Sequence, residues 1–332
     1  MKFDWAEIDN ALEVVRRTVP PTPAYFWPQL RRKTGVELVL KHENHTPTGS
    51  FKARGGLVYV DALRQSLEIG GLVTATRGNH GQSIAMGASA AGIETLIVVP
   101  RGNSIEKNRA MEAFGGTLLV AGDDFDDARR IAAEEAAERG WTLVPSFHRD
   151  IARGVATYAL ELFQGIGELD AVFVPVGMGS GICALIGMRD LLGLKTKIIG
   201  VVADKAPAFA LSYAGRSVRL AAATTFADGL ACREPHEEAL AAVIAGAEDV
   251  VRVTEWEIAE AIRDIYEMTH NLAEGAGAAA YAAVFKHRSA YRGKRVAAIL
   301  TGGNIDRRAM ATVLSGATPQ PGAQTMSLEP IA

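Results

Sequence analysis

The sequence predicts an open α/β fold in which the strands of a parallel sheet alternate with helices. Seven short runs rich in Val, Ile and Leu are almost continuously apolar, which is typical of parallel strands covered on both faces. Helical patterns lie between these runs, so the chain repeats a strand–helix unit. The length of 332 residues indicates roughly two domains.

Each of the seven runs is predicted as a buried strand. They span residues 36–41, 71–76, 95–100, 116–121, 171–176, 197–202 and 295–300. Among the intervening helices, residues 123–140 have an acidic start and a glycine stop at Gly140. Residues 319–332 are predicted to form a loose tail.

The composition is that of an ordinary globular protein. The chain has 35 Lys and Arg against 38 Asp and Glu, so nothing in its charge indicates nucleic acid or an anionic membrane as partner. The N-terminus lacks a signal-peptide pattern, and no apolar run reaches the roughly 18 residues of a membrane span. Cys183 and Cys232 are too few for a disulfide framework or a cysteine-based zinc site. We therefore expect a cytoplasmic protein.

Three glycine-rich stretches directly follow predicted strands. They are "TRGNHGQS" at residues 76–83, "GMGSG" at 177–181 and "TGGN" at 301–304. Ligands of parallel sheets bind at the carboxyl ends of strands, where glycines let the backbone approach closely. Residues 177–181 also open a helical pattern, so their N–H groups suit a phosphate. A tight turn without a ligand explains this stretch equally well when it is taken alone.

The stretch "HENHTPTGSFKARGG" at residues 42–56 places Lys52 between a turn-rich approach and the start of a helix. A Rossmann fingerprint would need a third glycine where Ile182 stands, and no P-loop sequence occurs. A lysine in such a turn, with a remote phosphate cup, points to a phosphorylated aldehyde held as an imine. Pyridoxal phosphate is the common cofactor of this kind. A solvated surface lysine is the usual reading of one lysine alone, but the three glycine-rich loops argue against it.

Taken together, "SFKARG", "GNHGQS", "GMGSG" and "TGGN" resemble the motifs of fold type II pyridoxal-phosphate enzymes, the tryptophan synthase β-like fold. The closest resemblance is to the serine/threonine dehydratase and serine racemase group, from about Pro20 to about Leu314. It implies pyridoxal 5'-phosphate in a cleft between two open twisted α/β domains. The large domain would comprise residues 1–48 and 144–318, the small domain residues 49–143, and the protein would be a homodimer.

The resemblance also assigns roles to individual residues. Lys52 would form the internal Schiff base, Phe51 would pack against the pyridine ring, and Thr301 would face the pyridine nitrogen. Asn79 would donate a hydrogen bond to the 3'-oxygen, and Glu274 would support this end of the ring. The phosphate cup would be Gly177, Met178, Gly179, Ser180 and Gly181, with Gly229 near the cofactor. The substrate carboxylate would bind at Thr76, Arg77, Gly78, Asn79 and His80.

The implied reaction is β-elimination by a carbon–oxygen lyase. Because a hydroxyl at Thr301 cannot protonate the pyridine as a carboxylate can, a long-lived carbanion is disfavoured and loss of a β-leaving group is favoured. We expect a dehydratase (ammonia-lyase) for a β-hydroxy amino acid of the L-threonine or L-serine type. Alternative substrates are 3-hydroxyaspartate, phenylserine or a hydroxyectoine-derived amino acid. A β-replacement synthase usually carries "SGNTG" in place of "GNHGQ", and a cofactor-binding protein without turnover would not need Lys52, Asn79 and Thr301.

Two departures from the group affect these expectations. Arg77 stands where racemase-like members carry a serine that acts as acid and base, and an arginine is a poor proton acceptor. Arg77 either binds a second anionic or polar group of the substrate or points outward to a surface acid, two readings of equal weight. Val202 and Ala208 replace the Glu and Asp that hold a divalent cation in racemase-like members, so no metal is expected.

Two further expectations concern side chains near Lys52. His42 and His45 have no acidic partner nearby and are predicted to form local hydrogen bonds rather than a zinc site. The apolar, glycine-rich wall around Lys52 is expected to lower the pKa of its ammonium group, so that a free amine is available.

Overall fold

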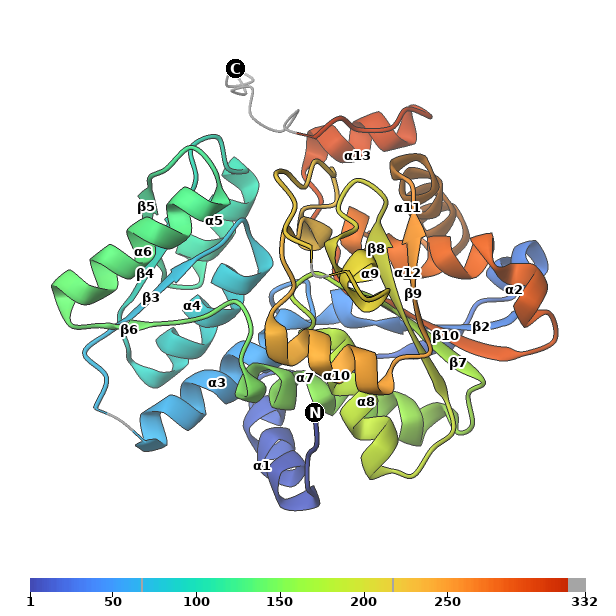
Figure 1. The fold of residues 1–332 in the computed structure, drawn as a ribbon, viewed down its shortest axis with the longest axis horizontal. Coiled ribbons are helices and arrows are strands. Elements are labelled where there is room, and N and C mark those ends of the chain that lie inside the picture. The colour runs from blue at the N-terminus through green and yellow to red at the C-terminus, as the bar shows by residue number, and fades with distance from the viewer. Residues whose placement is uncertain (67, 217, 322–332) are drawn as a thin grey trace.

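The computed structural model describes residues 1–66, 68–216 and 218–321 and contains two separate sheets. A six-stranded sheet has the order β1-β2-β10-β7-β8-β9, and a four-stranded sheet has the order β5-β4-β3-β6. All neighbouring strands are parallel except β1 and β2. Figure 1 shows the two sheets beside one another, each with its own helices. We call the six-stranded sheet with its helices the six-stranded unit, and the four-stranded sheet with its helices the four-stranded unit.

All seven predicted strands form. They are β2 (Glu37–His42), β3 (Leu72–Ala75), β4 (Thr95–Val99), β5 (Thr117–Val120), β7 (Ala171–Pro175), β8 (Lys197–Ala203) and β10 (Arg295–Leu300). The prediction that all seven are buried is wrong for β5, because this strand lies at an edge of its sheet and leaves Thr117 and Val120 exposed. Three strands were not predicted: β1 (Ala24–Phe26), β6 (Thr142–Leu143) and β9 (Asp249–Val253). All three lie at sheet edges, and each is too short or too polar to produce an apolar run.

Helices fill the connections between the strands. They are α1 (Trp5–Arg16), α2 (Pro28–Thr34), α3 (Lys52–Ser66), α4 (Asn79–Ala91), α5 (Ile105–Ala113), α6 (Phe125–Arg139), α7 (Arg149–Ile166), α8 (Ser180–Leu191), α9 (Ala208–Tyr213), α10 (Glu237–Gly246), α11 (Glu255–Thr269), α12 (Gly275–Lys286) and α13 (Arg307–Leu314), with short 3-10 helices η1 (Glu43–His45), η2 (Asp228–Leu230) and η3 (Arg288–Tyr291). The helix predicted within residues 123–140 is α6. Asp124 caps its start by accepting a hydrogen bond from the backbone N–H of Asp127, and Gly140 ends it with a φ of 64°.

Buried charges fix the first turn of α3, which begins at Lys52. The guanidinium of Arg54 lies 2.8 Å from a carboxylate oxygen of Glu43 and 2.8 Å from one of Glu161. Lys41 at the end of β2 lies 2.7 Å from Glu161, which belongs to α7. Each charge in this buried group is paired, so removing one partner would leave an uncompensated charge. The group therefore ties the start of α3 to β2 and α7 of the six-stranded unit.

Two other expectations bear on the chain as a whole. The tail predicted for residues 319–332 lies almost entirely outside the described residues. Within the described residues, none of the helices combines the length and apolar character that crossing a bilayer requires. Both cysteines are free and buried.

Candidate active site

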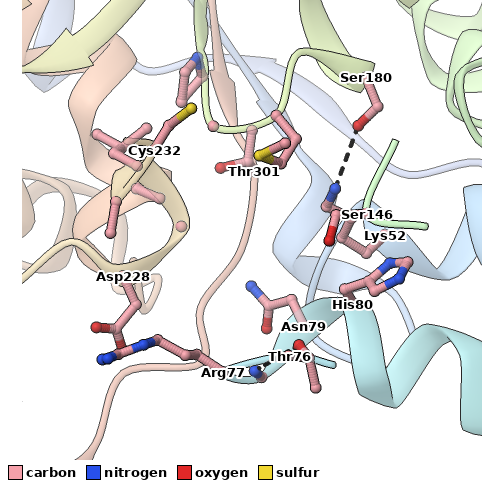
Figure 2. A pocket seen from close by; sticks show the side chains of 18 of the residues that line it. Lys52, Thr76, Arg77, Asn79, His80, Ser146, Ser180, Asp228, Cys232 and Thr301 are labelled. Atoms are coloured by element: carbon pink, nitrogen blue, oxygen red, sulfur yellow. Dashed lines mark hydrogen bonds between the residues drawn. The ribbon is translucent and has the colours of Figure 1, made fainter. Parts of the chain in front are cut away.

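One cavity of about 170 Å³ receives side chains from both units (Figure 2). It lies at the carboxyl ends of β3, β7 and β10, where the three glycine-rich loops begin. Every site residue predicted from the sequence lines it: Phe51, Lys52, Thr76, Arg77, Gly78, Asn79, His80, Gly177, Met178, Gly179, Ser180, Gly181, Gly229, Glu274 and Thr301. The fold therefore brings four distant sequence motifs to a single place.

Lys52 contributes an amine to this pocket. Its Nζ donates a hydrogen bond of 3.3 Å to Ser180 Oγ and lies 5.2 Å from the centre of the Phe51 ring. No ion pair of Lys52 occurs among residues 1–66, 68–216 and 218–321. Burial without a compensating carboxylate lowers the pKa of Lys52 to about 8, as expected from the sequence. A useful fraction of the amine is thus unprotonated near neutral pH.

The loop between β7 and α8 has the backbone of an anion site. Gly179 adopts a φ of 101°, which non-glycine residues rarely adopt. A Cβ on Gly177 would lie 2.2 Å from the carbonyl oxygen of Gly229, so the two loops touch through their backbones. The loop leads directly into the N-terminus of α8, whose free N–H groups attract negative charge. Together with the amine of Lys52, this cradle fits a phosphorylated aldehyde.

Asn79 and Glu274, which line the pocket, belong to a chain of side-chain amides and a carboxylate. Asn79 Nδ2 donates to Glu274 Oε1 at 2.7 Å, and Asn304 Nδ2 donates to Asn79 Oδ1 at 2.7 Å. Asn304 Nδ2 also donates to the carbonyl of Thr48 at 2.8 Å. Burial raises the pKa of Glu274 to about 7, although Lys107 and Asn79 favour its ionised form. Thr301, at the end of β10, places a buried hydroxyl-bearing residue in the same wall.

The loop before α4 is held open by a threonine. Thr76 Oγ1 accepts hydrogen bonds from the backbone N–H groups of Gly78 and Gly81, at 3.0 and 3.3 Å. His80 is buried, and its Nε2 has no hydrogen-bond partner in the part of the chain that the structure describes. Burial, with a smaller effect of the Lys52 charge, lowers the pKa of His80 to about 3, so its ring is neutral. An unpartnered ring nitrogen and open N–H groups suit a carboxylate ligand.

Arg77 lies at the open side of the pocket. It is exposed and lines the cavity, and it has no ion pair within 4.0 Å among the described residues. Figure 2 shows its side chain leading from the Thr76 loop to the side of the pocket that holds Asp228, away from Lys52. Hydrogen bonding to the backbone of Asp127, with a smaller effect of the Arg77 charge, lowers the pKa of Asp124, an exposed acid that caps α6. Both readings of Arg77 therefore stand as predictions.

Several residues of the pocket were not predicted from the sequence. They include Lys107, Phe125, Ser146, Asp228 and Cys232. Asp228 directly precedes Gly229, so its place beside a predicted site residue could have been noticed. Lys107 and Ser146 stand in segments without a motif, and only the packing of the units brings them to the pocket.

The positions considered for metals have other surroundings. Val202 in β8 and Ala208 at the start of α9 are both buried apolar residues. No group of three or more potential metal-ligating side chains occurs in the described part of the chain. His42 Nε2 accepts a hydrogen bond of 3.0 Å from Trp27 Nε1, and His45 Nε2 lies 2.7 Å from Asn271 Oδ1.

Comparisons with known proteins agree with this geometry. Residues 15–302 match the family described as pyridoxal-phosphate dependent enzyme. The chain is 34% identical to the biosynthetic L-threonine dehydratase of Salmonella typhimurium over 86% of its own length, and it spans 56% of that relative. It is 28% identical to the L-threo-3-hydroxyaspartate ammonia-lyase of Saccharomyces cerevisiae, covering 94% of this chain and 96% of the relative.

A solved structure extends the comparison to the fold. The processed form of threonine deaminase isoform 2 from Solanum lycopersicum superposes with a TM-score of 0.85 at 29% identity, covering 95% of this chain and 94% of that one. The predicted fold type II architecture and the predicted cofactor class are confirmed by these matches. The chain therefore belongs to the family of pyridoxal-phosphate dependent enzymes.

Proposed function

We propose that this protein is a dehydratase (ammonia-lyase) that removes water from a β-hydroxy amino acid and yields a 2-oxo acid and ammonia. The observation that carries the proposal is the half-buried amine of Lys52, which donates to Ser180 of the glycine-rich loop in the shared pocket. The names of the Salmonella and yeast relatives support the reaction class. L-Threonine or L-serine is the proposed substrate type.

Different residues of the pocket would serve the cofactor, the proton transfer and the substrate carboxylate. Bound pyridoxal phosphate supplies an electron sink conjugated to the substrate amino group. Residues 177–181 would hold its phosphate, and Asn79 would face its 3'-oxygen. The amine of Lys52, with its lowered pKa, is suited to accept the α-proton as a general base. The backbone N–H groups of Arg77, Asn79 and His80 and the unpartnered Nε2 of His80 are suited to the α-carboxylate.

Thr301 favours elimination over transamination. A threonine hydroxyl does not protonate a ring nitrogen, whereas a carboxylate at this place would. A cofactor held beside Thr301 would therefore be a weaker electron sink than one held beside a carboxylate, which suits loss of a β-hydroxyl. Racemisation is not expected, because an arginine is a poor proton acceptor and would not serve as the base on the opposite face.

A second substrate class is favoured by Arg77. Its guanidinium is exposed at the pocket and has no ion pair among the described residues. A β-substituent with carboxylate or other oxygen atoms, as in 3-hydroxyaspartate, could bind it with two hydrogen bonds. Phenylserine and a hydroxyectoine-derived amino acid are further candidate substrates, and the panel of amino acids described below includes both. A β-replacement synthase remains a less favoured alternative.

The proposal also covers the domain boundaries, the location, the oligomeric state and the metal requirement of the enzyme. Residues 49–143 would form the small domain, and residues 1–48 with 144–318 the large domain, with the cofactor between them. The protein would act as a cytoplasmic homodimer without a divalent cation. These points rest on the resemblance and, for the cation, on Val202 and Ala208.

Ammonia release from a panel of amino acids tests the proposal. The panel contains serine, threonine, 3-hydroxyaspartate, phenylserine and a hydroxyectoine-derived amino acid, and the product is identified as its 2-oxo acid. A Lys52→Ala variant should release none. Cysteine formation from an activated serine and sulfide, without ammonia release, would instead identify a synthase.

A further inference from the structure

Lys107 makes the ion pair that crosses the pocket from one unit to the other. It belongs to α5 of the four-stranded unit and is buried. Its Nζ lies 2.8 Å from Asp228 Oδ2, at the start of η2 in the six-stranded unit. Both residues line the cavity. The pair is charge-assisted, and Lys107 is buried, so removing Asp228 would leave the ammonium group without its nearest partner.

The methylene stem of Lys107 covers the loop that is suited to the substrate carboxylate. A Cβ on Gly78 would lie 2.8 Å from Lys107 Cδ and 3.5 Å from Cγ, so the stem rests directly on the Gly78 backbone. The N–H of Gly78 donates to Thr76 Oγ1, which shapes the loop. One side chain therefore contacts the loop with its stem and holds the opposite unit with its charge.

The ammonium of Lys107 also faces more than one carboxylate. Burial alone would lower the pKa of Lys107, but Asp228, Glu274 and Asp306 together raise it. These three acids come from η2, the start of α12 and the start of α13, all in the six-stranded unit. Removing the Lys107 charge would therefore leave these acids without this compensating cation.

Neighbouring contacts hold the same helix end in place. Ser104, the N-cap of α5, donates a hydrogen bond of 2.5 Å to Asp306 Oδ1. The backbone N–H of Arg307 donates to the carboxylate of Glu106 at 3.2 Å. The first turn of α5 is thus docked on the start of α13, which fixes the direction from which Lys107 reaches Asp228.

We propose that Lys107 is a positioning residue that holds the loop of residues 76–80 in the shape that receives the substrate α-carboxylate. Its stem supports Gly78, and its ion pair with Asp228 holds the side chain in place. Lys107 need not touch the substrate. The inference rests on the proposed function only in that residues 76–80 receive a carboxylate.

The central experiment compares three variants of the holoenzyme. Lys107→Met keeps most of the stem and removes the charge, Asp228→Asn removes the partner charge, and the double variant removes both. Lys197→Met is the matched control. Lys197 lies at the start of β8 and makes an exposed ion pair with Glu248. The probe is L-2-aminobutyrate, which has a carboxylate but no β-hydroxyl, and its affinity is read from the cofactor absorbance.

We expect Lys107→Met and Asp228→Asn each to weaken 2-aminobutyrate binding about tenfold, which is the loss of one charge-assisted bond. The double variant should be no weaker than the single variants, because both remove the same contact. With a β-hydroxy substrate, KM should rise about tenfold while kcat changes by less than about threefold. Cofactor content and the control variant should stay at wild-type values.

Hydrogen exchange supplies a measurement that requires neither turnover nor ligand. Amides 78–82 should exchange faster in Lys107→Met, whereas amides 95–99 of β4 should be unchanged. Equal affinity and equal exchange in Lys107→Met and Lys197→Met would overturn the inference. If Lys107→Met does not fold, the same comparison with Asp228→Asn decides it. Weaker 2-aminobutyrate binding in a protein that releases no ammonia from any substrate would reject the dehydratase and leave this inference intact.

Discussion

Asn79 and Glu274 meet across the pocket through a hydrogen bond of 2.7 Å, with the amide of Asn79 as donor and Oε1 of Glu274 as acceptor. The other end of the Asn79 amide accepts from Asn304, so its orientation is fixed by two partners. One N–H of Asn79 remains to face a ligand. Because the pKa of Glu274 is raised to about 7, the acceptor itself titrates near neutral pH.

Glu274→Gln should change how stability depends on pH. A carboxyl group whose pKa is raised in the folded state stabilises the fold below its ordinary pKa of 4.5, and this contribution is lost as pH rises through about 7. Between pH 5 and 8, wild type should therefore lose on the order of 1–3 kcal/mol relative to the variant. Thermal unfolding of both proteins at the two pH values measures this difference. Parallel behaviour of the two proteins would show that Glu274 keeps its ordinary pKa.

The rate of pyridoxal phosphate uptake should depend on pH with an apparent pKa below the ordinary value for lysine. Only the neutral amine reacts, and the pKa of about 8 places this form within reach at neutral pH. The rate at which the apoprotein takes up the cofactor should rise between pH 7 and 9 and then level off. Borohydride should fix the cofactor on Lys52. A midpoint near 10.5, or recovery of the reduced cofactor on another lysine, would contradict the assignment.

Gly177→Ala should release the cofactor. The new Cβ would lie 2.2 Å from the carbonyl oxygen of Gly229, so one of the two loops must move. Such overpacking costs about 1–3 kcal/mol and should weaken cofactor binding roughly ten- to a hundredfold. Gly165→Ala is the control, since a Cβ there meets nothing within 4 Å. Equal cofactor affinity in both variants would mean that this loop does not hold the phosphate.

Chelation should leave the enzyme active. Val202 and Ala208 offer no oxygen ligands, and hard cations require them. Activity after dialysis against EDTA should equal that of the untreated protein, and Mg²⁺ should not raise it. A loss that Mg²⁺ restores would establish a cation site elsewhere in the protein.

Arg77→Ala should change substrate preference. The loss of a charge-assisted bond costs about 1.5–3 kcal/mol, or roughly ten- to a hundredfold in kcat/KM. The loss should be confined to substrates with an anionic or polar β-group, and the variant should not racemise, because alanine supplies no base. The measurement is the kcat/KM ratio of 3-hydroxyaspartate to threonine. Arg130→Ala is the control, since Arg130 is exposed on α6 and pairs with Glu134. A wild type that prefers threonine, with a ratio that Arg77→Ala leaves unchanged, would make Arg77 structural.

The sequence by itself determined the features that depend on local backbone and burial. The seven apolar runs predicted seven strands, because a strand covered on both faces needs apolar residues at nearly every position. The ends of α6 could be predicted from its acidic start and Gly140, because Asp124 and Gly140 provide the cap at each end without help from distant residues. The three glycine-rich loops were readable for the same reason.

Tertiary structure alone decided which distant residues meet. The order β2-β10-β7 brings the "TGGN" loop beside both the Lys52 segment and the "GMGSG" loop, and no local pattern encodes that order. Lys107 and Asp228 stand 121 positions apart, and Asn79 and Glu274 stand 195 apart. In each pair the packing of the two units buries one partner, Lys107 or Glu274, and places a polar side chain of the other unit within hydrogen-bonding distance of it.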